Sequence, residues 1–541
     1  MKNLIENGQF NIGHICSTQQ CLNGNRDKKA IISISTEGRI NEYTFGDVDI
    51  YSNKMANVLT KLGFIEGEVF FTLLGRSFEQ TISFLASLKL KLITGSLFLN
   101  FGEEALFDRL KDSNAKGIIT HKNQLRKLLN IKKNLPYLKY IILTDIEKSE
   151  SEEVLSLPEI LSKSSENYLT SITLPDTSSV LHYTSGSTGK PKGVLHVHNS
   201  VILQNYTAAN ILSLKEDDLY WCTADPGWVT GTSYGIIGPM SLGVTQIYYE
   251  GGFNPHKWLE LLNEKGVSVW YTAPTALRML MQENENIFSD KNFDKLKYIF
   301  SVGEPLNPEI QVWGKRNFKK DIHDTYWQTE TGSIMIANRP GLKVNYGSMG
   351  KPIDKIKVKI ISDEGKELPD GETGNICIVP GWESMFKTYL NNESIYQNKF
   401  KNGLYYTGDK ASRDKDGYFW FSGRADDIIN TAGHLVSPFE VESCLLEIEE
   451  ITDTAVIAAY DEILFEKIIA FVKLKPGTEY NSELDLKIKL YINKKVSSMA
   501  VPKEIIVIDK VPKNKSGKIM RRYLRAKYEG KDPGDISTLD E

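Results

Sequence analysis

The strongest constraint on the fold is a regular alternation of short apolar runs with segments of helical periodicity. An apolar run at residues 68–74 precedes a segment, 77–90, in which Phe78, Ile82, Leu85 and Leu88 recur at helical spacing. Further apolar runs occupy residues 117–120, 140–143, 219–223, 244–249, 267–271 and 298–302. Strands that alternate with helices indicate parallel β-α-β units. We therefore predict an α/β fold in which a large N-terminal domain contains two doubly wound layers.

The pattern changes twice in the second half of the chain. Residues 343–423 combine short strands with turn pairs such as Asp370-Gly371 and Asp416-Gly417, which predicts a β-subdomain. The sequence after Arg424 predicts a compact α+β unit, with a helix that starts in a capping box at Ser437. A single hydrophobic core stops growing near roughly 250–300 residues. We expect an N-terminal domain at residues 1–425 and a small, mobile α+β C-terminal domain at 426–541. Residues 149–165, rich in Ser and Glu, are expected to form a surface connection.

Composition excludes several classes of protein. A net charge of -4 argues against a nucleic-acid partner or an anionic membrane surface, because both favour a basic surplus. No segment approaches the ~20 apolar residues of a membrane span, and the first residues lack a signal-peptide pattern. The chain has 5 cysteines without a C-x-x-C pair, which is typical of a reducing compartment. We expect a cytoplasmic protein.

Residues 183–193 read Tyr-Thr-Ser-Gly-Ser-Thr-Gly-Lys-Pro-Lys-Gly and form the most informative motif. Glycines let a backbone approach an anion closely, while hydroxyls and lysines add donors and charge. A flexible linker would lack the interleaved lysines. A P-loop would require Gly at Thr184 and Ser or Thr at Pro191. The motif therefore indicates a phosphate-binding loop of another kind.

This loop resembles the signature of the adenylate-forming superfamily, which includes acyl-CoA synthetases, luciferases and peptide-synthetase adenylation domains. Segments similar to the family's other motifs follow in the same order, at residues 301–305, 324–332, 406–409, 423–427 and 512–522. Residues 224–231, Ala-Asp-Pro-Gly-Trp-Val-Thr-Gly, resemble AMP-forming acetate–CoA ligases in particular. The resemblance covers nearly the whole chain and implies that ATP, Mg²⁺ and CoA are used.

The resemblance also implies roles for individual residues. The loop would hold the β- and γ-phosphates of ATP, Tyr326 would stack on adenine, and Asp409 would accept from the ribose hydroxyls. Glu330 would bind Mg²⁺, which usually takes one carboxylate and substrate phosphates. Asp426 would be the hinge, and Lys518 would be the catalytic residue that bridges the acyl carboxylate and the α-phosphate. The full set implied to bind the nucleotide is Thr184, Ser185, Gly186, Ser187, Thr188, Gly189, Lys192, Gly303, Glu304, Pro305, Asp324, Thr325, Tyr326, Trp327, Gln328, Thr329, Asp409 and Arg424.

The same resemblance narrows the acid and places the CoA site. Val229, Thr230, Val302 and Trp327 would line the acyl pocket, and many relatives that take longer acids carry Gly where this chain has Trp327. The indole predicts a two- or three-carbon acid, although Trp is also often buried for packing alone. CoA would contact Gly433, His434, Lys494 and Lys495. Leu435 stands where acetate–CoA ligases usually have a basic residue, which puts the thioester step in question.

We therefore expect an acyl-CoA synthetase that activates acetate or propionate through an acyl-AMP intermediate. Two alternatives stay open: a ligase for medium-chain or branched acids, and a catalytically weak AMP-binding paralogue with a sensing role. The expected partners are the short-chain acid, ATP and CoA. A homodimer, and a lysine acyltransferase or deacylase that acts on Lys518, are further partners to test.

Overall fold

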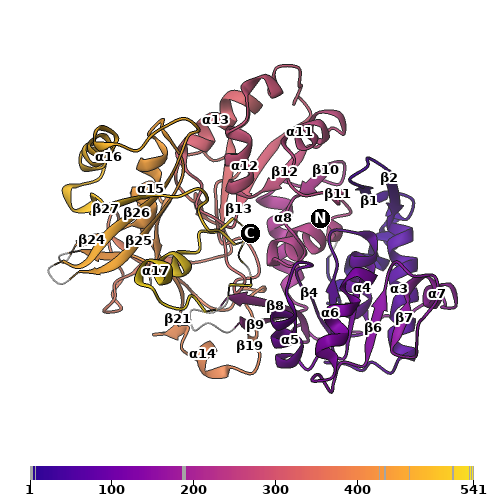
Figure 1. Ribbon diagram of the computed structural model, residues 1–541. Coiled ribbons are helices and arrows are strands. Elements are labelled where there is room, and N and C mark those ends of the chain that lie inside the picture. The colour runs from indigo at the N-terminus through magenta and orange to yellow at the C-terminus, as the bar shows by residue number, and fades with distance from the viewer. Residues whose placement is uncertain are drawn as a thin grey trace.

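The computed structural model describes residues 4–6, 8–185, 191–425, 427–431, 434–461, 464–514, 517–534, 536–537 and 539. The N-terminal part of the chain contains two large sheets, and the C-terminal part, orange to yellow in Figure 1, lies beside them. The geometry of the predicted site depends on how these parts meet.

A nine-stranded sheet carries the strands closest to the predicted site. Its strands from β1 to β14 run parallel, and β2, β15 and β16 pair antiparallel at its two ends. Its order is β16 (Lys351–Pro352), β15 (Ile336–Ala337), β14 (Ile322–Tyr326), β13 (Tyr298–Val302), β12 (Val269–Thr272), β10 (Leu219–Cys222), β11 (Thr245–Tyr249), β1 (Lys29–Ile34) and β2 (Ile40–Thr44).

An eight-stranded sheet forms the second layer. Strands β4, β3, β5, β6 and β7 run parallel in that order, whereas β8 and β9 form an antiparallel hairpin beside β4. The order is β19 (Thr388–Tyr389), β9 (Pro191–Val197), β8 (Ser178–Ser185), β4 (Ile93–Ser96), β3 (Val69–Leu73), β5 (Gly117–Thr120), β6 (Tyr140–Leu143) and β7 (Val154–Ser156).

Helices cover both faces of each sheet. One core between the two sheets is formed with α1 (Ile12–Ile15), α3 (Phe45–Lys61), α4 (Phe78–Lys89), α7 (Leu157–Ser162), α8 (Ser200–Asn210), η2 (Ser233–Ile237) and α10 (Gly238–Ser241). The outer face of the eight-stranded sheet packs on α5 (Glu103–Asp112) and α6 (Lys122–Lys132). The outer face of the nine-stranded sheet packs on α11 (Pro255–Glu264), α12 (Pro274–Met281), η3 (Glu285–Phe288) and α13 (Pro308–Phe318). The short elements α2 (Thr18–Gln20), η1 (Cys21–Asn25) and α9 (Val229–Thr232) lie in the connections.

The rest of the chain builds two smaller sheets. The first contains β17 (Val358–Ile361), β18 (Thr373–Ile378), β20 (Phe400–Lys401), β21 (Leu404–Arg413) and β22 (Phe419–Arg424), with α14 (Glu393–Gln397) beside them. The second contains β23 (Ile429–Thr431), β24 (His434–Val436), β25 (Ile451–Asp461), β26 (Phe465–Leu474) and β27 (Glu504–Val507). Its helices are α15 (Pro438–Leu446), α16 (Ser482–Lys495), η4 (Ser498–Ala500) and α17 (Arg521–Glu529).

The predicted fold class is confirmed, and most strand positions agree to within two residues. The Ser437 hydroxyl accepts from the Glu440 amide (3.2 Å) at the start of α15, as the capping motif predicts. The prediction for residues 149–165 is wrong, because this segment contains β7 and α7. Strand β7 pairs with β6, and Leu157 and Leu161 of α7 are buried. Within the described residues, no helix is long and apolar enough to cross a membrane.

A buried ion pair ties the N-terminal helices together. Lys89, at the end of α4, is 0% exposed, and its Nζ donates to Asp49 Oδ1 (3.0 Å) and Asn53 Oδ1 (2.6 Å) of α3. The Thr18 hydroxyl donates to the same Asp49 oxygen (2.6 Å). Burial lowers the pKa of Lys89, and the Asp49 carboxylate opposes that shift. The pair therefore depends on both charges being present.

Lys89→Met should lower the free energy of unfolding by about 3–5 kcal/mol, because it leaves the Asp49 charge buried and unpaired. Adding Asp49→Asn should restore much of the loss, since the amide oxygen can still accept from Thr18. The measurement is the urea midpoint of each variant. Lys29→Met, which breaks a half-exposed pair with Glu42, is the control and should change little. Equal, additive losses from the two changes at positions 49 and 89 would contradict this account.

Candidate active site

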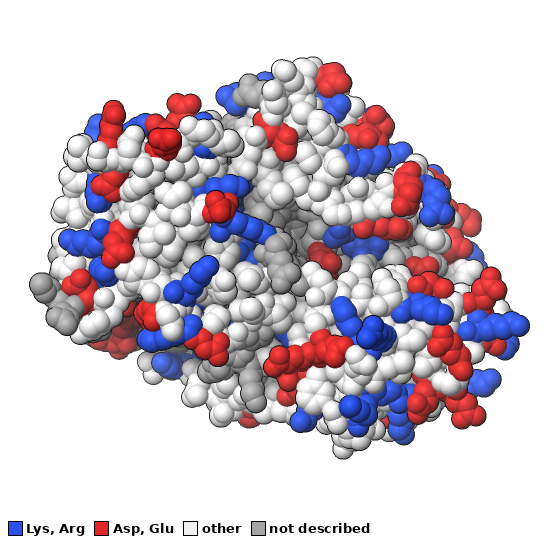
Figure 2. Space-filling model, viewed as in Figure 1, with Lys and Arg blue, Asp and Glu red and all other residues white. Residues whose placement is uncertain are grey.

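The predicted motifs meet in a cleft at the carboxyl ends of β13 and β14. Val302, Gly303 and Glu304 continue from β13, while Trp327 and Gln328 continue from β14. Ligands of open α/β sheets bind outside the carboxyl ends of the strands. Figure 2 shows a hollow near the middle of this face, with Lys and Arg side chains beside it. The parallel pairing of β13 and β14 therefore brings two separate motifs to one place.

The two ends of the phosphate-loop motif lie on β8 and β9, which pair as an antiparallel hairpin. Thr184 pairs with Lys192 across the hairpin, and Tyr183 pairs with Gly193. Desolvation lowers the pKa of Lys192, and the neighbouring cations Lys399 and Arg424 act in the same direction, while Glu330 opposes them. Gly186, Ser187, Thr188 and Gly189 lie outside the described residues, as does the side chain of Ser185. The described part of the hairpin thus places the Lys192 ammonium near Arg424 and Glu330.

Asp409 is the point where the two sheets of the site meet. Its Oδ2 accepts from the Tyr326 hydroxyl (2.6 Å), at the end of β14, and from the Gln328 side-chain amide (2.6 Å), which follows β14. Arg424 Nε lies 3.8 Å from Asp409 Oδ1. Burial raises the pKa of the Tyr326 hydroxyl, and the Asp409 carboxylate raises it further. The sequence motifs around residues 326 and 409 are therefore joined directly.

Two residues of the 324–332 motif lie beneath the cleft. Asp324 is 5% exposed and Thr325 is 3% exposed, since both are inside β14. Asp324 Oδ1 accepts from the Ser301 hydroxyl (2.6 Å), and Thr325 Oγ1 donates to the Ser301 carbonyl (2.7 Å). Burial raises the pKa of Asp324 to about 7. These two residues bind β13 to β14 and are covered by the residues that face the cleft.

Thr329 and Glu330 lie in the turn that follows β14 and Gln328. Glu330 Oε1 accepts from the Tyr389 hydroxyl (2.7 Å), which orients the carboxylate. Burial lowers the pKa of the nearby His196 to about 4. One oriented carboxylate fits Mg²⁺, which keeps several waters and takes its other ligands from phosphates. Within the described ranges, no group of three or more His, Cys, Asp or Glu side chains is placed to hold a metal ion.

The residues predicted to line the acyl pocket lie on three elements. Val229 and Thr230 begin α9, Val302 ends β13, and Trp327 follows β14. The Trp327 indole Nε1 donates to the Tyr271 hydroxyl (3.2 Å), and its ring meets Tyr234 edge-on at 5.1 Å. The indole is therefore fixed from two sides. The sequence did not predict Tyr271 and Tyr234 as residues of the acyl pocket. The one sequence signal for Tyr271 was its place at the end of a predicted strand.

Lys518 approaches the cleft from the C-terminal part of the chain. Lys518 is exposed at the surface, yet the surrounding protein desolvates the ammonium and lowers its pKa. Arg424 lowers the pKa of Lys518 further, while Asp409 opposes the shift, so these three side chains share one site. The amide of Lys518 donates to Asn514 Oδ1 (2.9 Å), which closes the loop that carries it.

The residues predicted for CoA and for the hinge are only partly described. Asp426 and Gly433 lie outside the described residues, and His434 and Leu435 are described only through the backbone of β24. Lys494 and Lys495 end α16, and Lys495 Nζ pairs at 2.9 Å with Oε2 of Glu447, which caps the end of α15. The structure therefore does not bring these two lysines together with the residues around Lys518.

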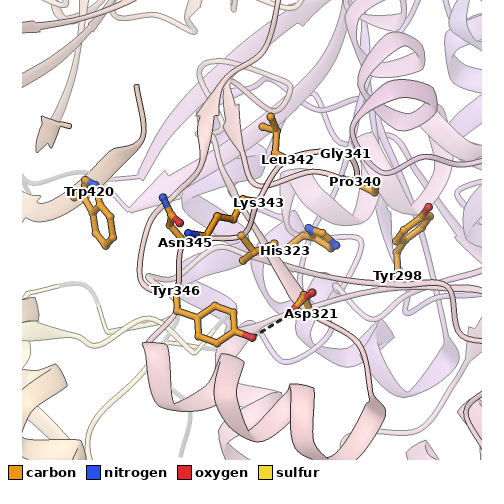
Figure 3. A pocket seen from close by; sticks show the side chains of 11 residues that line it. Tyr298, Asp321, His323, Pro340, Gly341, Leu342, Lys343, Asn345, Tyr346 and Trp420 are labelled. Atoms are coloured by element: carbon orange, nitrogen blue, oxygen red, sulfur yellow. Dashed lines mark hydrogen bonds between the residues drawn. The ribbon is translucent and has the colours of Figure 1, made fainter. Parts of the chain in front are cut away.

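A cavity of about 770 Å³ lies at the amino ends of β13 and β14, the ends opposite those where the predicted motifs meet. Tyr298, Asp321 and His323 line it near the amino ends of β13 and β14, and residues 340–346 form another part of its wall (Figure 3). The Tyr346 hydroxyl donates to Asp321 Oδ1 (3.0 Å) across it. Because the predicted motifs meet at the carboxyl ends of these strands, this cavity is separate from the candidate active site.

Comparison with known proteins agrees with this geometry. The curated acetyl-coenzyme A synthetase of Bacillus subtilis (strain 168) is 42% identical over 518 residues, which is 95% of this chain and 90% of that protein. That of Methanothrix thermoacetophila is 36% identical over 561 residues, covering 98% of this chain and 85% of that protein.

Two solved structures share the fold. The anthranilate CoA ligase AuaEII in complex with anthranoyl-AMP has a TM-score of 0.88 and 28% identity, over 97% of this chain and 99% of that one. ATP-bound MatB from Rhodopseudomonas palustris has a TM-score of 0.86 at 20% identity, over 96% and 99%, which shows likeness of fold.

Family models match both parts of the chain. The model described as AMP-binding enzyme covers residues 18–390, and the one described as AMP-binding enzyme C-terminal domain covers residues 440–518. The first match alone spans more than half of the chain and includes the β8–β9 hairpin together with β13 and β14. The chain belongs to the AMP-binding enzyme family.

Proposed function

We propose that this protein is an AMP-forming acetate–CoA ligase, which uses ATP, Mg²⁺ and CoA. The observation that carries the proposal is the meeting of Lys518, Arg424 and Asp409 in one cleft, in a chain 42% identical to an acetyl-coenzyme A synthetase. The acid carboxylate would attack the α-phosphorus of ATP, and the bond to pyrophosphate would break, which leaves acyl-AMP. The CoA thiol would then attack the acyl carbon and release AMP.

In the first step the protein would mainly position and stabilise charge. Tyr326 and Gln328 would hold Asp409 ready to accept from the ribose hydroxyls. Lys192 and the hairpin turn would meet the β- and γ-phosphates, while Thr329 would meet the α-phosphate. Glu330 would hold Mg²⁺, which neutralises phosphate charge when bound. Lys518 would bridge the two reacting groups.

The adenine would lie along the segment after β13, and the remaining predicted residues would support it. Gly303 has φ +90° and leaves open space where a Cβ would stand, which suits close approach of a flat ring. Glu304 and Pro305 continue the same segment. Asp324 and Thr325 would act indirectly, because they hold β13 against β14 from below.

The second step would need the C-terminal part of the chain to turn. We propose a domain boundary at residues 425/426 with Asp426 as the hinge, so that residues 1–425 and 426–541 move as two domains. The turn would withdraw Lys518 and bring Gly433 and His434 to the thioester site, with Lys494 and Lys495 as candidates for the CoA 3′-phosphate. Leu435 replaces a basic residue there, which favours a slower CoA step and keeps the sensing paralogue as the second candidate function.

The fixed indole of Trp327 supports a short acid. Two hydrogen-bonded tyrosines hold it, so the pocket wall cannot yield easily to a longer chain. We propose acetate as the main substrate and propionate as the next, rather than medium-chain or branched acids. We also propose a cytoplasmic location, a homodimer, and control by acylation of Lys518, which is exposed at the surface.

Acid-dependent release of pyrophosphate, measured with and without CoA on a C2 to C8 series of acids, tests the proposed function. A ligase for short acids should release pyrophosphate with acetate and propionate and form the thioester only when CoA is present. Release that peaks at C6 or beyond would favour the longer-acid alternative. Nucleotide binding without acid-dependent release would favour the sensing paralogue.

Lys518→Ala should abolish adenylation and leave thioester formation from supplied acetyl-AMP close to the wild-type rate. The lysine would stabilise charge only in the first half-reaction, since it leaves the site before CoA attacks. Single-turnover assays of each half-reaction measure the difference. Lys527→Ala, on the exposed face of α17, is the control and should retain both activities. A folded Lys518→Ala variant that loses both half-reactions equally would disprove the assigned role.

Trp327→Gly should shift the preference from C2–C3 acids to C5–C8 acids. Each buried methylene adds ~0.8 kcal/mol where space exists, whereas forcing one against a fixed wall costs roughly 1–3 kcal/mol. The comparison uses kcat/KM for each acid, because discrimination lies in that ratio. Trp327→Phe should move the limit by less than the Gly variant does. An unchanged chain-length profile in Trp327→Gly would mean that the indole only packs.

A further inference from the structure

A set of polar contacts joins α12 to the segment predicted to lie along the adenine. The amide of Thr275, at the start of α12, donates to Glu304 Oε1 (3.3 Å). Arg278, one turn later, donates from Nη2 to Glu304 Oε2 and to the Thr275 hydroxyl (2.7 Å). The Arg278 side chain is 13% exposed and that of Glu304 is 6% exposed. Glu304 is therefore held in one orientation by two residues that no sequence motif singled out.

The same hydroxyl reaches the loop that carries Lys518. Thr275 Oγ1 donates to the carbonyl of Gly517 (3.3 Å), while it accepts from Arg278. Gly517 has φ +88°, and a Cβ there would lie 2.3 Å from both Glu304 Oε1 and Thr275 Oγ1. Only glycine allows this approach, because no real Cβ could stand so close to those oxygens. The lysine loop thus rests directly on the adenine segment.

Charges across the same boundary alternate in sign. Arg278 of α12 interacts with Glu304 and with Asp453 of β25, and Asp453 Oδ2 accepts from Lys513 Nζ (2.6 Å). Lys513 begins the strand-like segment that leads to the Lys518 loop, and its side chain is 13% exposed. The Arg278–Glu304 pair and the Asp453–Lys513 pair each lie on one side of the boundary, and the attraction between Arg278 and Asp453 acts across it.

We propose that Thr275 and Arg278 are positioning residues for adenylation, which couple the adenine segment to the docking of the lysine loop. Thr275 positions the carbonyl of Gly517, the residue before Lys518. Arg278 positions the Glu304 carboxylate and attracts that of Asp453. A nucleotide that orders Glu304 therefore also stabilises the docked loop, which places Lys518 at the reacting groups. This inference rests on the proposed function, and it assigns both residues to the first half-reaction only.

Thr275→Val tests the inference, because it removes the hydroxyl and keeps the shape and the backbone amide. The kcat of acetate- and ATP-dependent pyrophosphate release should fall about tenfold, the effect of losing one hydrogen bond. The KM for ATP should change little, since Glu304 keeps its contacts with Arg278 and the Thr275 amide. Thioester formation from supplied acetyl-AMP should stay at the wild-type rate, and Thr275→Ser should restore adenylation.

Gln282→Ala is the matched control. Gln282 caps the other end of α12 and donates to the Thr452 carbonyl (3.0 Å), so it also crosses the boundary, but at a distance from Glu304 and the lysine loop. It should retain both half-reactions. Wild-type adenylation in Thr275→Val, or equal losses in both half-reactions, would overturn the inference while the wild-type enzyme remains active. A wild-type protein that releases no pyrophosphate with any acid would instead refute the proposed function, and the inference with it.

Discussion

The hydrogen bonds from Tyr326 and Gln328 to the Asp409 carboxylate are the interaction on which the site depends. They join the last residue of β14, and a residue shortly after it, to β21 of the smaller sheet. Asp409 is 4% exposed, and burying a carboxylate is costly unless donors such as these bind it. Once this contact forms, Arg424 of β22 is brought to the same edge as the carboxyl ends of β13 and β14. The cleft is a consequence of that junction.

Electrostatics in the cleft favour a bound polyanion. Lys192 and Lys518 both have their pKa values lowered by desolvation, and Arg424 lowers both further. The cations repel one another in the free protein, and bound phosphates would neutralise that repulsion. The free protein is therefore electrostatically preorganised to bind a nucleotide. Burial also raises the pKa of Asp324, in β14, to about 7, so this carboxyl adds less than a full negative charge at neutral pH.

The sequence was informative wherever a local pattern carried the structure. Tyr298–Val302 was predicted to the residue, because an apolar run of that length between turns can be buried as a parallel strand. Residues 149–165 were misread, because their Ser and Glu content hides the buried Val154 and Leu157. The partners of the site residues were also beyond reach. Tyr389 meets Glu330 from 59 positions away, and Thr275 meets Gly517 from 242 positions away. Such contacts depend on how elements pack, for which one sequence has no local signal.

The glycine at position 517 has a consequence for the energetics of domain motion. The core clusters of the described N- and C-terminal parts share no member, and Phe421 with Phe439, near the proposed hinge, is the aromatic pair that bridges them. The lysine loop meets α12 through the backbone carbonyl of Gly517, which accepts from the Thr275 hydroxyl. Loss of this contact therefore exposes polar groups that water can satisfy. Exposure of apolar surface is the main source of a heat-capacity change. This contact should thus contribute only a small heat-capacity change to the docking of the loop, so that its enthalpy of docking depends little on temperature.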